Sequence, residues 1–398
     1  MKKFFMFAAM ASVALVSCVK NEPAATFNEQ EEISFVEPVM GPNVKAVNTV
    51  AETSVFPANG QFDVWAHYCA GTPDFSQPTN LSMYMDQITC AKDGANAYWK
   101  STEGKYYWPT TGNLTFVAYA PTVPAVTTDF EADLNETNQI TFAGYQIPAL
   151  ANEDLLVSER AYACTKPGAT TEAAKGDANY WGGSEITFKH VLSSIVFKVK
   201  SKEPYDTYTP KYQLQVTKIE ILGVNYKGNF VQTFVDGAQP SMDFTKIMWT
   251  PATPTQTTNY VAFEAPDGTD ADNDGKYDDY VAGNAVPLTE TAVYAMNNTG
   301  TKTTDASNLI LLPQEIPAEA QVKVTYTIWN STMGEAEPAG GQIAEATLKT
   351  ATVPTWMPGK RYTYTITVGL EEIYLDPAVA SWEDGATPDE IEGVNQHN

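Results

Sequence analysis

Histidine, arginine and cysteine are scarce in this chain of 398 residues, and their scarcity excludes several kinds of site. It has three histidines and four cysteines, and its only arginines are Arg160 and Arg361. The sequence contains no HExxH zinc motif, no GxSxG nucleophile elbow and no glycine loop of the phosphate-binding type. Carboxylates alone do not indicate glycosidase chemistry, because 48 acidic residues always allow some pair at a suitable distance. We therefore expect no enzymatic activity and no required cofactor.

Positive charge is equally scarce. The 24 basic residues are outnumbered by the 48 acidic ones, and the formal net charge is −24. Binding to phosphate backbones requires a basic face, so this balance excludes nucleic acid as a partner.

Only one long hydrophobic run is present, at residues 4–16, and it is too short to span a bilayer stably. Two lysines precede it, and it ends in a Leu-Val-Ser-Cys motif whose last residue is Cys18. This is the order of a lipobox, in which the small Ser17 lets the lipoprotein signal peptidase reach the bond before a cysteine that carries diacylglycerol. We predict a lipoprotein signal peptide at 1–18 and an exported, lipid-anchored protein of the outer membrane surface. An ordinary signal peptide with an incidental cysteine is the alternative.

After lipidation of Cys18, three cysteines remain: Cys69, Cys90 and Cys164. An odd number of thiols cannot be fully paired, so at most one disulfide is expected. Their spacing matches no metal motif, which favours small buried side chains. The mature chain keeps 22 of the basic residues and all 48 acidic ones, for a formal charge of −26.

Helical periodicity is nearly absent, and strand patterns dominate. β-Branched and aromatic residues alternate with polar ones in several segments bounded by Gly, Pro, Asn and Asp. The clearest are residues 114–119, 186–188, 194–199, 322–328 and 362–368. The 25 glycines and 25 prolines are scattered between such segments as turns. This pattern predicts an all-β fold of antiparallel sandwiches.

The length suits two domains. We expect a tether and first strand at 19–45, with a polar tether at 19–30. An N-terminal β-sandwich at 46–185 and a C-terminal β-sandwich with an acidic tail at 186–398 should follow.

Four segments behind the lipobox carry a family resemblance. They are KYYWPTTGNLTFVAYAP at 105–121, FKHVLSSIVFKV at 188–199, PGKRYTYTI at 358–366 and IYLDPAVASWEDG at 373–385. Their order and spacing resemble the fimbrillins, the type V pilins and Mfa-like lipoproteins of Bacteroidota. The resemblance implies two transthyretin-like β-sandwich domains in tandem and a structural or tip component of surface fibres.

In that family, subunits are understood to assemble by strand exchange after proteolysis removes the first strand. Carried over, the removable strand is Ile33, Ser34, Phe35 and Val36, and the cut lies in the segment 41–47. The best-known members are cut after arginine, whereas here Lys45 is the residue open to a trypsin-like protease, which would make Ala46 the new first residue. A permanent edge strand at 33–36 is the alternative. The identity of the donor strand is also left open. Either the run 373–379 is donated, or the chain accepts a strand without offering one.

The resemblance implies other fimbrial subunits, copies or accessory proteins, as partners, and adhesion to a host or bacterial surface receptor. A monomeric surface lipoprotein that binds glycans through exposed Trp65, Trp99 or Trp181 is one alternative. A lipid-retaining anchor for a fibre of other subunits is another. His190 is expected to be a hydrogen-bonded packing residue within a strand.

One acidic segment has the spacing of a calcium loop. Asp270, Asp272, Asp274 and Asp278 occupy relative positions 1, 3, 5 and 9, with Gly275 at position 6. Alternate carboxylates can converge on one hard cation, although the glutamate usual at position 12 is replaced by valine. Calcium is therefore a candidate ligand, and a solvated acidic hairpin loop is the alternative.

Overall fold

In the computed structural model, most of the described residues lie in β-strands. The described residues are 27–40, 56, 60–75, 78–94, 98–122, 130–135, 139–151, 153–165, 183–202, 212–234, 242–252, 255–264, 286–288, 291–295, 308–330, 335–369 and 373–381. Over these ranges the only helices are two short 3-10 turns, η1 (Pro78–Asn80) and η3 (Phe244–Lys246). In that same part of the chain no helix has the length and hydropathy to cross a membrane. The all-β class predicted from the sequence is confirmed.

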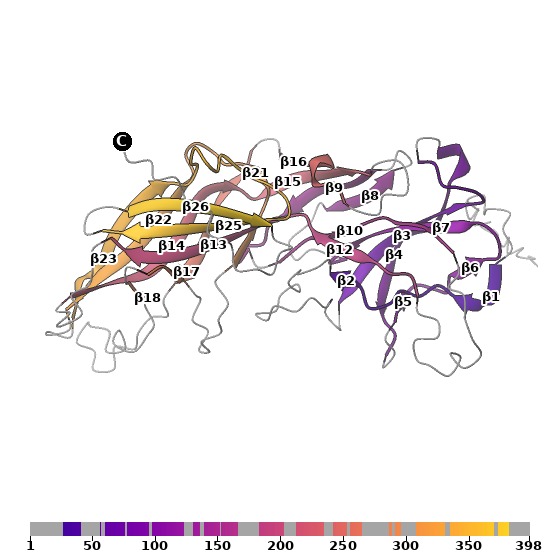
Figure 1. Ribbon diagram of the computed structural model, residues 1–398, viewed down its shortest axis with the longest axis horizontal. Helices are drawn as coiled ribbons and strands as arrows, with labels where there is room; N and C mark the ends of the chain where they lie inside the picture. The colour runs from indigo at the N-terminus through magenta and orange to yellow at the C-terminus, as the bar shows by residue number, and fades with distance from the viewer. Residues whose placement is uncertain are drawn as a thin grey trace, which may run out of the picture.

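An eight-stranded sheet forms the N-terminal half of the elongated molecule, on the right in Figure 1. Its order is β2 (Val39–Met40), β12 (Thr187–His190), β10 (Leu156–Ser158), β7 (Asn113–Ala120), β3 (Gln61–Cys69), β4 (Ser82–Lys92) and β5 (Trp99–Ser101), and β11 (Ala161–Cys164) also pairs with β7. A separate two-stranded ladder joins β1 (Phe27–Glu32) to β6 (Tyr107–Pro109). One face of the sheet encloses an aromatic-rich core.

Two five-stranded sheets form the C-terminal half. One has the order β19 (Val293–Tyr294), β13 (Ser193–Ser201), β25 (Lys360–Val368) and β26 (Ile373–Ser381), with β20 (Asn308–Leu311) also on β13. The other has the order β17 (Thr257–Glu264), β14 (Tyr212–Asn225), β22 (Gln321–Asn330) and β23 (Glu335–Thr347), with β18 (Val286–Pro287) also on β14. Apolar side chains of both sheets, such as Val199 and Ile219, share one core.

A four-stranded sheet draws strands from both sides of residue 185. Its order is β16 (Ile247–Pro251), β15 (Lys227–Thr233), β9 (Gln139–Gln146) and β8 (Glu131–Asn135). Within it Phe142 stacks on Phe230, with ring centroids 4.9 Å apart. A last short pair joins β21 (Gln314–Glu315) to β24 (Thr355–Trp356). The domain boundary near residue 185 stays a prediction.

The five strand segments singled out in the sequence are confirmed as β7, β12, β13, β22 and β25. Two strand pairs differ from the antiparallel expectation, because β2 runs parallel to β12 and β13 runs parallel to β25. Alternation with period two specifies which side chains are buried and carries no information on the direction of a neighbour far away in the sequence. The parallel pairs could not be predicted for that reason.

A tight turn at residues 110–112 connects β6 to β7. Gly112 has a φ of +79°, and an added Cβ would lie 2.5 Å from the carbonyl oxygen of Cys69. Glycine is required there because φ is positive and because a side chain would overlap the Cys69 carbonyl.

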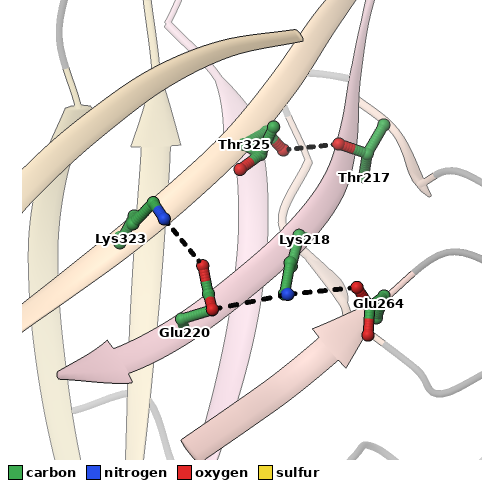
Figure 2. A network of polar contacts seen from close by, with 6 residues as sticks. All are labelled: Thr217, Lys218, Glu220, Glu264, Lys323 and Thr325. Carbon is green, nitrogen blue, oxygen red and sulfur yellow. Dashed lines mark hydrogen bonds and ion pairs between the residues drawn. The ribbon is translucent and has the colours of Figure 1, made fainter. Parts of the chain in front are cut away.

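A row of alternating charges crosses the C-terminal sheet that contains β14 (Figure 2). Lys218 lies 3.1 Å from a carboxylate oxygen of Glu264 and 3.4 Å from one of Glu220, and Lys323 lies 3.1 Å from the other oxygen of Glu220. Partial burial works against ionisation of Glu220, but the hydrogen bond from Lys323 and the charge of Lys218 lower its pKa below the usual value. The row therefore connects the three neighbouring strands β17, β14 and β22.

Because these groups are partly exposed, we expect the row to contribute little to stability. Glu220→Gln should lower the free energy of unfolding by about 0.5–1 kcal/mol at low ionic strength. In about 1 M salt, where the screening length is about 3 Å, most of that difference should disappear. Urea unfolding at both salt concentrations measures it, with the exposed Glu319→Gln as control. A loss that is independent of salt would show that packing, not charge, is responsible.

Candidate functional site

The N-terminal segment 27–40 lies against the rest of the N-terminal half by backbone hydrogen bonds on two sides. Its first part, β1, runs antiparallel to β6, with Phe27 opposite Pro109 and Glu32 opposite Tyr107. The Ile33 amide then donates to the carbonyl oxygen of Tyr106 at 2.7 Å. Its last part, β2, runs parallel to β12.

Between these two strands, Phe35 joins both ends of the eight-stranded sheet. Its amide donates to the carbonyl oxygen of Trp99 in β5, and its own carbonyl accepts from the Trp99 amide, both at 2.9 Å. On the other side, the Ser184 amide donates to the Ser34 carbonyl at 2.9 Å and the Val36 amide donates to the Ser184 carbonyl at 3.2 Å. Without this segment, β5 and the chain next to β12 would both have unpaired edges.

The side chains of the segment belong to the core that it covers. Phe35 is 0% exposed and Ile33 is 3% exposed. The ring of Phe35 meets Phe62 and Phe116 edge-to-face, with centroids 5.5 Å and 5.2 Å apart. Burying each such side chain stabilises the docked segment by about 1.5–3 kcal/mol.

Gly183 provides the space in which the segment crosses. A Cβ at this position would lie 2.0 Å from the Ser34 carbonyl oxygen and 2.7 Å from the Phe35 amide nitrogen. Both are backbone atoms and cannot rotate away. Sequence reasoning missed this residue, although a Gly-Gly pair directly before a strand is typical of close approach between backbones.

The position of the first strand differs from the expectation. Ile33 and Phe35 do share an inward face, but Phe35 forms isolated bridges, and the first strand is β1, which begins at Phe27 inside the expected tether and pairs with β6 through a register shift. The sequence of β1, FNEQEE, is rich in residues that strands rarely contain, so propensity gave no signal there. Removal of the strand stays a prediction.

Several predicted site residues lie outside the described residues. These are Cys18, Lys45, Ala46, Trp181 and the four aspartates of the calcium loop, Asp270, Asp272, Asp274 and Asp278. Over the ranges that the structure does describe, no group of three or more His, Cys, Asp or Glu could hold a metal ion.

Two of the three tryptophans named for the glycan-binding alternative are buried. Trp65 is 1% exposed and Trp99 is 0% exposed, so neither can stack on a sugar ring. The Trp99 indole donates instead to the Gly60 carbonyl at 3.1 Å. The expectation that these two are surface residues was wrong because both faces of their sheet are covered.

Cys69, Cys90 and Cys164 are free thiols. Burial, together with the charges of Asp63 and Glu103, raises the pKa of Cys90. Burial also raises the pKa of Cys164, although a hydrogen bond with Ser184 works against it. Raised pKa values make thiols poor nucleophiles, which agrees with a packing role.

His190 is a packing residue, as expected. It lies in β12, fully buried, and its Nδ1 contacts a carboxylate oxygen of the equally buried Asp154. This contact between a carboxylate and an imidazole connects β12 to the residues just before β10.

A second polar cluster lies around Asp63 in β3. Its carboxylate accepts hydrogen bonds from Thr89 Oγ1 at 2.7 Å and from the Tyr119 hydroxyl at 2.8 Å. Burial raises the pKa of Asp63 above its ordinary value of 3.8, in spite of these hydrogen bonds.

A raised pKa in the folded state means that protonation of Asp63 favours folding. This contribution is present below pH 3.8 and is lost as the pH rises through the folded-state pKa. Asp63→Asn cannot ionise, so we expect it to escape that loss. The unfolding free energy of the variant minus that of the wild type should therefore increase from pH 3.8 to the folded-state pKa of Asp63 and then level off. Urea unfolding at a series of pH values checks this. A difference that does not vary with pH would contradict the raised pKa.

Comparison with known proteins gives the family. The sequence matches the fimbrillin-like family over residues 46–382. The structure is similar to a fimbrial protein from Bacteroides vulgatus ATCC 8482, with a TM-score of 0.53 and 19% identity over 86% of this chain and 99% of that chain. A putative cell adhesion protein from Bacteroides uniformis ATCC 8492 aligns with a TM-score of 0.44 and 14% identity over 89% of this chain and 99% of that chain. No curated protein sequence matches. Because the family match spans most of the chain and the fold agrees, the chain belongs to the fimbrillin-like family.

Proposed function

We propose that this fimbrial subunit assembles into a surface fibre by exchange of its N-terminal segment. The observation that carries the proposal is the double role of residues 33–36, whose backbone joins both ends of a sheet while Ile33 and Phe35 fill its core. Loss of the segment would expose backbone donors, backbone acceptors and an apolar groove at the same time. A strand from another subunit repairs all three.

The precursor is held at the outer membrane by lipid on Cys18, and a cut after Lys45 releases the segment. Four residues lie between Met40, the end of β2, and Lys45, so a cut after Lys45 separates the whole segment from the rest of the chain. The lipidated precursor is acidic, with a formal charge of −26, which keeps its body away from anionic headgroups. Partners are copies of this chain or accessory subunits, and adhesion to a surface receptor follows from the role in a fibre.

Calcium at Asp270, Asp272, Asp274 and Asp278 is a separate proposal, which calcium titration of the mature chain tests.

Treatment of the purified precursor with trypsin tests the strand-exchange proposal. We expect the wild type to lose its N-terminal segment and to form multimers that survive SDS at room temperature. Lys45→Gln should stay monomeric, whereas Lys20→Gln, which lies upstream of the segment, should behave as the wild type. Equal multimer formation by Lys45→Gln would contradict a cut at this position.

A further inference from the structure

The groove under segment 27–40 makes different demands at positions 33 to 36, and at the first of them Ile33 is buried in the same core as Phe35. Phe35 occupies an aromatic enclosure with Phe62 and Phe116 at its ring edges, and Trp99 and Trp108 belong to the same core. A smaller side chain at this position would leave a cavity among rigid rings, which is costly.

The position before it requires a small side chain. Ser34 is 3% exposed, so its side chain is enclosed on all sides. A long side chain at position 34 would overpack this site and force its neighbours to move. By contrast, Val36 is half-buried, so the position after the aromatic residue tolerates change.

The direction of the chain is fixed as well. Phe35 bridges antiparallel to Trp99 and parallel to Ser184, and β2 continues parallel to β12. A strand that entered in the opposite direction would present its side chains in reverse order to the same pockets.

On the basis of the proposed strand exchange, we infer that the groove selects its incoming strand by an aliphatic–small–aromatic triplet. The ligand is an extended segment of another subunit that runs parallel to β12. Its aliphatic residue takes the place of Ile33, its small residue that of Ser34 and its aromatic ring that of Phe35.

The triplet discriminates between candidate donors. Strand β26 contains one aromatic residue, Tyr374, and the bulky Ile373 directly precedes it. The strand is also paired with β25 from Ile373 to Ser381. It therefore lacks the small residue that the groove requires, so the strand that a second copy donates lies outside β26.

Peptide capture by the full mature chain tests the inference. A specific protease site placed within residues 41–55 allows the chain to be cut once, and a labelled peptide of residues 27–40 is then added in excess. The peptide is compared at equilibrium, by fluorescence anisotropy, with peptides carrying Phe35→Ala, Ser34→Leu or, as control, Val36→Ala. We expect the native and Val36→Ala peptides to bind alike, Ser34→Leu to bind at least about 10-fold more weakly and Phe35→Ala about 100-fold more weakly.

The outcomes separate the two proposals. Equal capture of all four peptides would overturn the triplet and leave strand exchange intact. Failure of the cut chain to capture even the native peptide would overturn strand exchange at this groove, and the triplet with it.

Discussion

Gly183→Ala should release the N-terminal segment without unfolding the rest of the protein. The new methyl group would overlap the Ser34 carbonyl oxygen, at 2.0 Å, and the Phe35 amide nitrogen, at 2.7 Å, so the crossing backbone must move. Such overpacking costs about 1–3 kcal/mol and more where backbone is involved. Gly183 has no unusual φ, so the expected effect is purely steric.

Hydrogen exchange measures that release directly. The amides of Ile33, Phe35 and Val36 donate to fixed carbonyl oxygens and should be protected in the wild type. In Gly183→Ala we expect them to exchange at least about 10-fold faster, because about 1.4 kcal/mol corresponds to a factor of ten. Gly104→Ala is the matched control, since no atom lies within 4 Å of its new methyl group. Unchanged exchange in Gly183→Ala would mean that the segment does not cross at this glycine.

Asp154→Ala should cause a large loss of global stability. Asp154 and His190 are both about 1% exposed, and they join the turn before β10 to the end of β12. The same carboxylate also accepts a hydrogen bond from the Leu155 amide at 2.8 Å. Removing one partner of a buried hydrogen-bonded pair costs about 1–3 kcal/mol, and more where a charged group is involved, because the other group stays buried without its counterpart.

Urea unfolding of the two proteins gives the size of this loss. The exposed ion pair between Glu315 and Lys349, at 2.8 Å, supplies the control. Glu315→Ala should change the unfolding free energy by less than about 1 kcal/mol, since solvent screens such pairs. If Asp154→Ala also cost less than about 1 kcal/mol, the pair would not be the structural link described.

The sequence predicted the parts of the fold that depend on side-chain alternation and turn chemistry. Strands β7, β22 and β25 have β-branched or aromatic residues in alternation, and Gly112 marks a turn that requires a positive φ. Strand β1 was missed because its polar sequence resembles a tether, and its pairing with β6 is a tertiary effect.

The candidate site could be predicted in its apolar residues but not in its surroundings. Ile33 and Phe35 were recognisable as neighbours on one face, because they are two residues apart. The role of Gly183 depends on a backbone nearly 150 residues earlier in the sequence. The exposure of Trp65 and Trp99 was misjudged for the same reason, since long-range pairing determines which sheet faces are covered.

Strand exchange requires that residues 27–40 leave the chain and that another subunit's strand takes their place. The most direct test is the N-terminal residue of the protein sheared from intact cells, determined by intact mass and Edman degradation beside an unboiled SDS gel. If strand exchange occurs, we expect a start at or just after Ala46, together with a ladder of multimers. A start at a lipidated Cys18 with monomer alone would contradict it.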